Sequence, residues 1–324
     1  MKSLCFQVSE AVEGTPVQGM PSLDVEASFL QKTIRTALLA GISGAVILSA
    51  ALAGEKASAD EPDATAQIAE TSSSSDSDQK CARAGMVIMG HRGIGMGTKM
   101  IDGKKVTEDT IPAFQAAVRH GADGFETDIW FTKDGKPVHN HDPRLERTSN
   151  GKGYIADRPY SYIKKLRTDS GAKIPTHTQV LETMRNAHGL QQQEFKMKEP
   201  QEDQIRLVIK QDYKYIQGIH TNLLITSGDA DTVEMVNAID PTIQTGLIAR
   251  GHNYQVPLNK VPEGTDVILL DIGAVDKQYV SDALESGYQV SLRGIDTVQM
   301  LHKAARLGVT RVVTDEPVNI GNAC

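Results

Sequence analysis

The segment GADGFETDIWF, residues 121–131, carries the signals that decide the fold. A helical pattern over Ile111–Arg119 precedes it and is stopped by Gly121, and a β-rich run over Gly124–Ile129 follows. This succession of helix, glycine and strand recurs along the chain. The predicted strands are Val87–Gly90, Gly124–Ile129, Arg206–Lys210, Leu223–Thr226, Ile243–Leu247, Val267–Asp271, Gln289–Leu292 and Arg311–Thr314.

Helical patterns occupy the intervals between these strands. Besides Ile111–Arg119 they are Thr178–Ala187, Ala230–Ile239, Asp276–Ser286 and Thr297–Arg306. Eight strands that alternate with helices predict an α/β fold of the (β/α)₈ TIM-barrel type, and a doubly wound open sheet is the alternative. The long interval from Phe131 to about Leu190 predicts a hairpin and loop insertion after strand 2, over the mouth of the barrel.

The composition is that of a soluble globular protein. The 324 residues include 34 Lys and Arg against 41 Asp and Glu, a net charge of −7, which argues against nucleic acid as a partner. Charged residues make up 23% of the chain and hydrophobic residues 40%, with a mean hydropathy of −0.30. These values exclude a disordered chain and a protein that spans the membrane many times.

The first 59 residues have the pattern of a signal peptide. Residues 36–54 carry no charge and follow Lys32 and Arg35, and Ala57-Ser58-Ala59 has the form of a cleavage site. A membrane anchor is the alternative, although this run is rich in Ala and Gly. We therefore expect a secreted protein, cleaved near Ala59.

Residues 60–80 are rich in Ser, Asp, Glu, Ala and Thr and lack apolar periodicity, so we expect a disordered linker. The barrel is expected to occupy residues 81–324. Cys81 and Cys324 stand at its two ends, where they either form a disulfide in an oxidising compartment or remain separate thiols.

Polar residues stand at the carboxyl ends of the first two predicted strands, where a barrel places its active site. The first strand runs into His91 and Arg92, and the second contains Glu126 and Asp128. Because residues two apart on a strand share a face, these carboxylates repel each other unless a cation or a shared proton intervenes. Oxygen ligands suit Ca²⁺ or Mg²⁺, so we predict a metal site, with a solvated pair at the rim as the alternative.

Histidines and a lysine add the remaining groups. His139 and His141 lie two apart on an extended segment, and His91 with His141 offers an acid and a base near neutral pH, unless these histidines are structural. Arg92, and Lys210 at the end of the predicted third strand, suit a phosphate anion. These groups together predict cleavage of a phosphodiester.

Several motifs agree in order and spacing with one enzyme family. They are His91-Arg92-Gly93, Glu108-Asp109-Thr110, GADGFETD at 121–128, TKDGKPV at 132–138, His141-Asp142, LERTSNGKG at 145–153, Ile174-Pro175-Thr176, Gly308-Val309 and VTDEP at 313–317. Over roughly residues 86–317 the chain resembles the glycerophosphodiester phosphodiesterases. The resemblance implies a TIM barrel that hydrolyses a small glycerophosphodiester to glycerol phosphate and an alcohol, in glycerophospholipid metabolism.

The resemblance also implies roles for individual residues. His91 and His141 would be the acid-base pair, Arg92 and Lys210 would bind the phosphate, and the two carboxylates of the second strand would bind the metal. Glu108 matches an acidic position near the mouth of the active site, and its alternative role is to favour the start of the helix at Ile111.

Two departures from the family pattern affect these expectations. A metal-binding Glu is expected two residues before the lysine of strand three, but that position is Val208. We therefore expect weakened, displaced or lost metal binding, with Asp271 or Asp212 as candidate substitutes. Arg293 stands where the family has Trp, which favours a second anionic contact and a more charged substrate.

Two other functions are kept open. The first is an enzyme of phospholipase D type that acts on intact lipid, with peripheral contact to a lipid surface. Exposed apolar residues around Tyr154–Tyr162 would favour it. The second is a barrel that binds a phosphate ligand without catalysis, as expected if the metal was lost with the Glu at Val208.

Overall fold

The computed structural model describes residues 85–321 except 186–189, 198–199, 217 and 251–253. The predicted signal peptide, the predicted linker, Cys81 and Cys324 lie outside the described residues. None of the helices within the described ranges combines the length and apolar character required to cross a bilayer.

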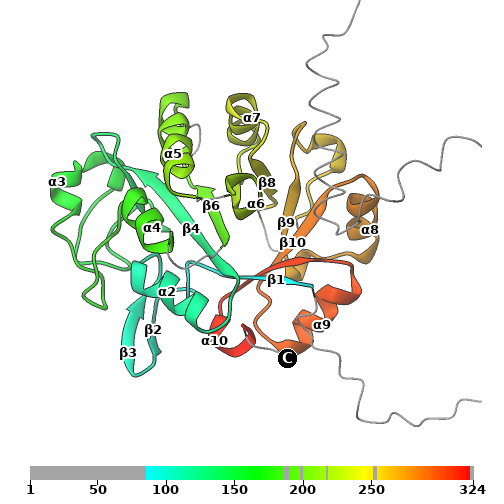
Figure 1. The fold of residues 1–324 in the computed structure, drawn as a ribbon, viewed down its shortest axis with the longest axis horizontal. Coiled ribbons are helices and arrows are strands. Elements are labelled where there is room, and N and C mark those ends of the chain that lie inside the picture. Colours follow the sequence, from blue (N-terminus) through cyan, green and yellow to red (C-terminus); the bar gives the residue numbers. More distant parts are fainter. Residues whose placement is uncertain (1–84, 186–189, 198–199, 217, 251–253, 322–324) are drawn as a thin grey trace, which may run out of the picture. The chain divides into compact units, whose positions relative to one another are not determined.

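Eight parallel strands form a closed barrel (Figure 1). They are β1 Val87–Gly90, β4 Gly124–Phe131, β6 Leu190–Phe195, β7 Leu223–Ser227, β8 Gln244–Ile248, β9 Val267–Asp271, β10 Gln289–Arg293 and β11 Arg311–Thr314. Each pairs with the next in this order, and β1 pairs with both β11 and β4, with Met89 opposite Gly124. This closure confirms the predicted barrel over the doubly wound alternative.

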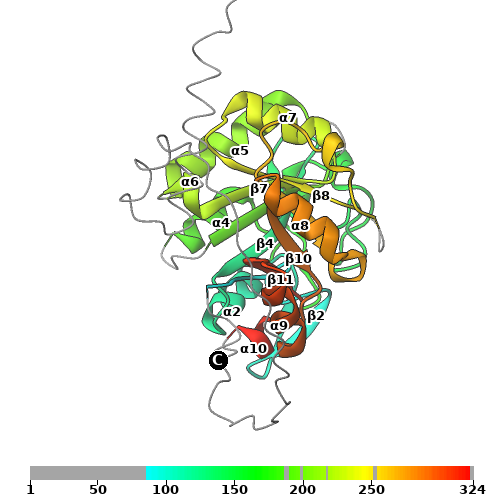
Figure 2. The same cartoon turned by 90° about the vertical axis from the view of Figure 1, so that its right-hand side faces the viewer.

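Helices lie outside the strands, as the side view also shows (Figure 2). The α-helices are α2 Ile111–Arg119, α3 Tyr160–Ile163, α4 His177–Met184, α5 Glu202–Tyr215, α6 Ile219–Asn222, α7 Ala230–Ile239, α8 Lys277–Glu285, α9 Val298–Arg306 and α10 Pro317–Ile320. Short 3₁₀ turns are η1 Ile155–Asp157, η2 Leu258–Lys260 and η3 Ile272–Ala274. Side-chain caps begin several helices: Asp229 caps α7, Asp276 caps α8 and Thr297 caps α9, each accepting a hydrogen bond from a first-turn amide.

The core is divided between the two faces of the barrel wall. In β9, Ile268 and Leu270 belong to the apolar cluster that contains Val280 of α8, whereas Val267 and Leu269 cluster with side chains of β7 and β8. This alternation follows the two-residue period of a strand. Because both faces are covered, strands such as β1 and β9 are nearly continuous apolar runs.

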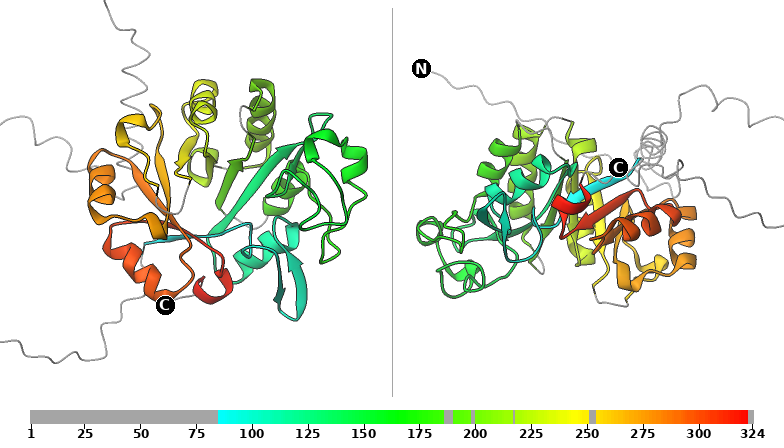
Figure 3. Two further views of the ribbon diagram at one scale, coloured as in Figure 1. Left: turned by 180° about the vertical axis from the view of Figure 1, so that it is seen from behind. Right: turned by 90° about the horizontal axis from the view of Figure 1, so that it is seen from below.

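Two hairpins extend the structure beside the barrel. The strands β2 Thr98–Ile101 and β3 Lys104–Thr107 form an antiparallel pair after β1. β5 Pro137–His139 runs antiparallel to β4, with Ile129 opposite His139. The segment after β5 carries η1 and α3 around its own apolar cluster, on the opposite side of the barrel from β9 and β10 (Figure 3). The hairpin and loop insertion predicted after strand 2 is therefore confirmed.

One predicted strand is wrong. Arg206–Lys210 lies within α5, where Ile205, Val208, Ile209 and Asp212 are buried at helical spacing. The third barrel strand is β6 instead, with the sequence LQQQEF. The sequence pattern did not predict β6 because of its three glutamines, since a buried strand in a parallel barrel is expected to be apolar.

Candidate active site

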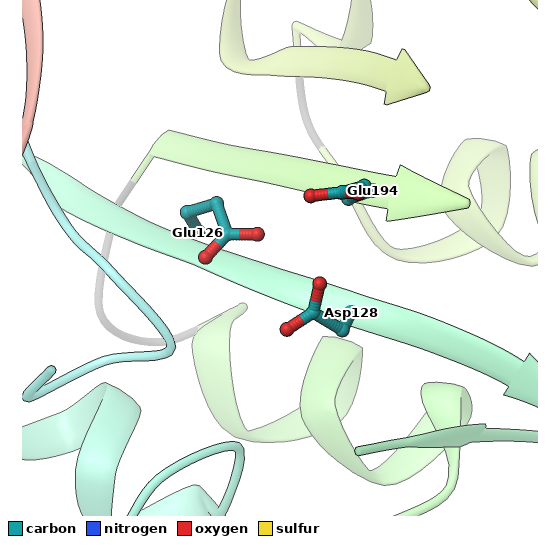
Figure 4. A group of neighbouring side chains, drawn as sticks. All are labelled: Glu126, Asp128 and Glu194. Carbon is teal, nitrogen blue, oxygen red and sulfur yellow. The ribbon is translucent and has the colours of Figure 1, made fainter. Parts of the chain in front are cut away.

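Three buried carboxylates meet at the ends of two adjacent strands. Glu126 and Asp128 lie on β4, Glu194 lies on β6, and the register places Asp128 opposite Glu194. One carboxylate oxygen from each lies within 4.8 Å of the other two. Figure 4 shows the three side chains turned toward a common space. The solvated pair at the rim is excluded, since each residue is at most 5% exposed.

The electrostatics of this cluster favour a bound cation. Burial and the neighbouring charge of Asp128 raise the pKa of Glu126 to about 7. Burial also opposes ionisation of Asp128, but Lys196, His141 and Arg92 together lower its pKa. Both oxygens of Asp128 are buried without a hydrogen-bond partner. Buried acceptors without donors and three converging carboxylates fit a hard divalent cation such as Ca²⁺ or Mg²⁺.

Lys196, directly after β6, is the lysine of the site. Its Nζ lies 3.0 Å from Glu194 Oε1 and 3.5 Å from Asp128 Oδ1. The prediction that Lys210 binds phosphate is corrected, because Lys210 is exposed on the helix α5 and not at the end of a strand. The segment Glu194-Phe195-Lys196 holds the pattern of a Glu two residues before the lysine.

The expected loss of a metal ligand at Val208 is also corrected, because the predicted strand that contained Val208 is part of the helix α5. Val208 is a core residue of α5, so it does not replace the family Glu; Glu194 holds that position. Neither proposed substitute belongs to the carboxylate cluster. Asp212 accepts a hydrogen bond from His177, and Asp271 pairs with Arg293.

His91 follows β1 and faces the cluster with one nitrogen. Its Nδ1 lies 2.5 Å from Asp315 Oδ1, and its Nε2 lies 3.9 Å from Glu126 Oε2. Burial opposes protonation of the imidazole, but the hydrogen bond to Asp315 and the charge of Glu126 raise its pKa. Asp315 therefore fixes the ring and leaves Nε2 toward the carboxylates.

His141 is held in the same manner from the other side. Its Nδ1 lies 2.6 Å from Asp142 Oδ1, and its Nε2 lies 3.3 Å from Lys196 Nζ. Trp130 donates a hydrogen bond to the His141 carbonyl, so the single tryptophan of the chain supports the segment that carries His141. Burial, with Lys196 and Arg92 nearby, lowers the pKa of His141.

Arg92 is buried beside the cluster in a constrained conformation. Its backbone N–H donates to Glu126 Oε2 at 3.0 Å, and its guanidinium Nε lies 3.7 Å from Asp128 Oδ2. Its φ of 50° is in the left-handed region, and Gly93 follows with φ of 86°. A guanidinium at this position presents donors to an anion at the carboxylate cluster.

The opposite part of the barrel mouth carries a charged pair. Arg293 ends β10 and Asp271 ends β9, and Arg293 Nη2 lies 3.1 Å from Asp271 Oδ1. Arg250, after β8, reaches Glu194 Oε1 at 3.3 Å. The mouth is therefore polar on this side as well.

Sequence reasoning placed five site residues together and missed four: Glu194, Lys196, Asp315 and Arg147. The pattern Glu-Phe-Lys after the glutamine run was the available signal for the first two. Asp315 stood in a recognised motif at the end of β11, where a barrel places functional groups. Arg147 belongs to the loop after β5, so only the folded loop reveals its contacts.

A closed barrel whose acidic, basic and imidazole groups gather at the carboxyl ends of its strands belongs to the TIM-barrel enzymes, and this set of groups suits a phosphorylated substrate. Comparison of the sequence with known families identifies the family. Residues 91–319 match the Glycerophosphoryl diester phosphodiesterase family, and the chain belongs to this family.

Known relatives agree with this assignment. A glycerophosphodiester phosphodiesterase of Caldanaerobacter subterraneus is 27% identical over 254 residues, which cover 73% of this chain and 96% of the relative. One of Bacillus altitudinis is 28% identical over 223 residues, covering 65% and 89% of the two chains.

A solved structure shares the fold. A phosphodiesterase of Oleispira antarctica, in complex with the product sn-glycerol-3-phosphate, superposes with a TM-score of 0.63 at 23% identity, covering 75% of this chain and 98% of the other.

Proposed function

We propose that this glycerophosphodiester phosphodiesterase cleaves its substrate by metal-assisted acid-base catalysis, with Glu126, Asp128 and Glu194 as metal ligands and His91 and His141 as the acid-base pair. One observation carries the proposal: each imidazole is fixed at Nδ1 by a carboxylate and directs Nε2 toward the site. Such anchoring selects the tautomer and orientation needed for proton transfer.

Different residues of the chain are proposed to perform different parts of the reaction. A bound Ca²⁺ or Mg²⁺ would supply positive charge to the phosphoryl oxygens. Arg92 and Lys196 stabilise the negative charge on the non-bridging oxygens. One imidazole takes a proton from the attacking water, or from the neighbouring substrate hydroxyl through a cyclic phosphate, while the other gives a proton to the departing alkoxide.

The substrate is proposed to be a small glycerophosphodiester released in glycerophospholipid breakdown. The names of the relatives support this class, and the Oleispira structure holds glycerol phosphate. The phospholipase D reading has less support, because Ile155 and Ile163 of the expected apolar loop are buried, and Tyr154, which is 46% exposed, is in contact with the charged Arg144 guanidinium. The reading as a binding barrel without catalysis loses its basis, since Val208 does not stand at a metal position.

Turnover of glycerophosphocholine, glycerophosphoethanolamine and intact phosphatidylcholine, each with Ca²⁺, Mg²⁺ or EDTA, tests the proposal. We expect hydrolysis of the two small diesters that requires metal, and a loss on the order of 10² in kcat for His91→Ala and His141→Ala. Release of choline from the intact lipid alone would transfer the assignment to the phospholipase D reading. Full activity of both histidine variants would refute the acid-base roles.

Secretion is a separate proposal, supported by the pattern of residues 1–59. Expression of the full chain in a bacterial host, followed by N-terminal sequencing of the exported protein, tests it. A mature start near Asp60 is expected, and retention of the uncut chain in the membrane fraction would favour an anchor.

A further inference from the structure

Arg147 contacts two carboxylates that belong to different parts of the site. It lies in the loop after β5, and its Nη1 and Nη2 donate to Glu108 Oε2 and Oε1 at 3.0 and 2.5 Å. Its Nε donates to Asp142 Oδ2, and its Nη2 lies 3.3 Å from Asp142 Oδ1. The planar guanidinium thereby bridges Glu108 and Asp142, which a single ammonium group would do less well.

Of these two carboxylates, that of Asp142 supports His141. Asp142 Oδ1 holds His141 Nδ1 at 2.6 Å, so the direction of the imidazole depends on where the Asp142 carboxylate lies. Asp142 is partly exposed and belongs to an irregular segment. The ion pair with Arg147 is therefore the contact that fixes this carboxylate in one orientation.

The second carboxylate supports Arg92. Glu108 is 3% exposed and accepts a hydrogen bond from Arg92 Nη1 at 3.0 Å. Its other hydrogen bonds come from Arg147 and the Gly97 amide. Because Arg147 occupies both oxygens of Glu108, Arg92 makes one contact there. The Arg92 Nε remains buried without a hydrogen-bond partner, beside Asp128.

We infer that Arg147 is a positioning residue, which holds His141 through Asp142 and keeps the Arg92 Nε available to the substrate phosphate through Glu108. The inference rests on the proposed function and deepens it. It predicts that the proton-transfer group and the phosphate-binding group lose their positions together when the guanidinium is removed, although Arg147 itself does not contact the carboxylate cluster.

Arg147→Met and Arg147→Lys test the inference, with Arg144→Met as the matched control in the same loop. Arg144 pairs with Glu146 and stacks on Tyr154, away from both carboxylates. We expect kcat to fall at least about tenfold in Arg147→Met, partial recovery in Arg147→Lys, and wild-type kcat in Arg144→Met. Added guanidinium should restore part of the activity of Arg147→Ala but not that of His141→Ala.

A double-mutant cycle separates positioning from general damage. If Arg147 acts through Asp142, the loss in Arg147→Met with Asp142→Asn will be smaller than the product of the two single losses. Losses that simply multiply would assign Arg147 a structural role. The same conclusion would follow if Arg147→Ala had a lowered melting temperature and its kcat were not restored by guanidinium. Unchanged kcat in Arg147→Met would overturn the inference while leaving the proposed function intact.

A readout without turnover distinguishes failure of the inference from failure of the proposed function. Nitrogen-15 NMR of the histidine rings should show His141 protonated at Nδ1 in the wild-type protein. In Arg147→Met the His141 signals should change to those of mixed tautomers, and the His91 signals should stay unchanged. An unchanged His141 tautomer would refute the positioning role whether or not the wild-type protein hydrolyses the diesters.

Discussion

At the scale of single residues, Lys196 is the cation beside the buried carboxylates of the site. Lys196 is mostly buried, and its ammonium contacts both Glu194 and Asp128. Burial opposes its charged form, but the carboxylates of Asp128 and Glu194 raise its pKa, so it stays a cation. Without it, the buried negative charges would face His141 and the substrate phosphate with less compensation.

Lys196→Ala is therefore expected to lower kcat/KM for glycerophosphocholine by about 10², because a cation at the phosphate oxygens is worth a few kcal/mol in the transition state. Lys210→Ala is the matched control, since Lys210 is exposed on α5, and should keep wild-type activity. Steady-state kinetics of both variants decide the matter. Equal activity of the two variants would refute the role of Lys196.

The glycine after the His-Arg pair is a second determinant at this scale. Gly93 has a φ of 86°, and a Cβ built on it would lie 2.6 Å from the carbonyl carbon of Ala113 in α2. The β1 loop can therefore approach α2 closely only with glycine at this position. This approach places His91 and Arg92 over the end of the barrel.

Gly93→Ala should destabilise the protein by about 2 kcal/mol or more, because it adds a steric clash to the cost of a left-handed conformation. Gly103→Ala separates the two effects, since Gly103 also has positive φ but its Cβ would meet open space. The control should lose only about 1 kcal/mol. Urea unfolding measures both, and equal losses would show that the clash relaxes without cost.

At the scale of elements, a buried polar chain ties β4 and β5 to the helices α4 and α5. Thr127 Oγ1 lies 2.6 Å from His139 Nδ1, His139 Nε2 lies 3.1 Å from His177 Nδ1, and His177 Nε2 lies 2.9 Å from Asp212 Oδ1. All four residues are at most 1% exposed. His139, two residues from His141, thus has a structural role.

Burial, with His177 close by, lowers the pKa of His139 well below 6.5. Below pH 6.5 the unfolded chain binds a proton at this residue that the folded protein does not, so His139 lowers the free energy of unfolding as pH falls. The effect approaches about 1.4 kcal/mol per pH unit. Stability curves from pH 7.5 to 5 should be steeper for the wild type than for His139→Gln, and parallel curves would contradict the assignment.

The same scale shows what the sequence could and could not predict. Seven of the eight strands were predicted because they are rich in β-branched and apolar residues, and their ends placed His91, Arg92, Glu126 and Asp128 together. β6 was missed because Gln191, Gln192 and Gln193 are polar yet buried in the barrel, where Gln193 Nε2 donates to Asp212 Oδ1 of α5. Because the third strand was predicted in the wrong place, Lys210 was predicted as the phosphate-binding lysine, and Val208 was wrongly interpreted as the loss of a metal ligand.

At the scale of the whole molecule, the carboxylate cluster is predicted to couple metal binding to folding. Three buried acidic groups within 4.8 Å repel one another in the folded chain and are far apart when it unfolds. A cation that binds only the folded protein therefore stabilises it by mass action. The barrel joins the contributing strands β4 and β6, so the gain is shared by the whole domain.

Ca²⁺ or Mg²⁺ at about 100 times its Kd should add about 2.7 kcal/mol to the free energy of unfolding, which corresponds to a rise of about 5–10 °C in Tm. EDTA should reverse the rise, and Glu194→Gln should reduce it. Calorimetric melting curves measure these shifts. A wild-type Tm that neither ion changes would argue against a metal at the three carboxylates.

The pairing of β5 on β4 sets the spacing between His141 and the carboxylates of Glu126 and Asp128. β4 carries Glu126 and Asp128 and then continues to Phe131, and the chain returns so that the Asn140 amide donates to the Asp128 carbonyl. One more or one fewer residue in the turn at 132–136 would displace His141 by about 3.3 Å along the strand and reverse the face on which it lies. The length of this turn is therefore fixed by the position of His141, and its shape is held by the Thr132 hydroxyl, which donates to Asp134 Oδ1 and accepts from the Lys136 amide.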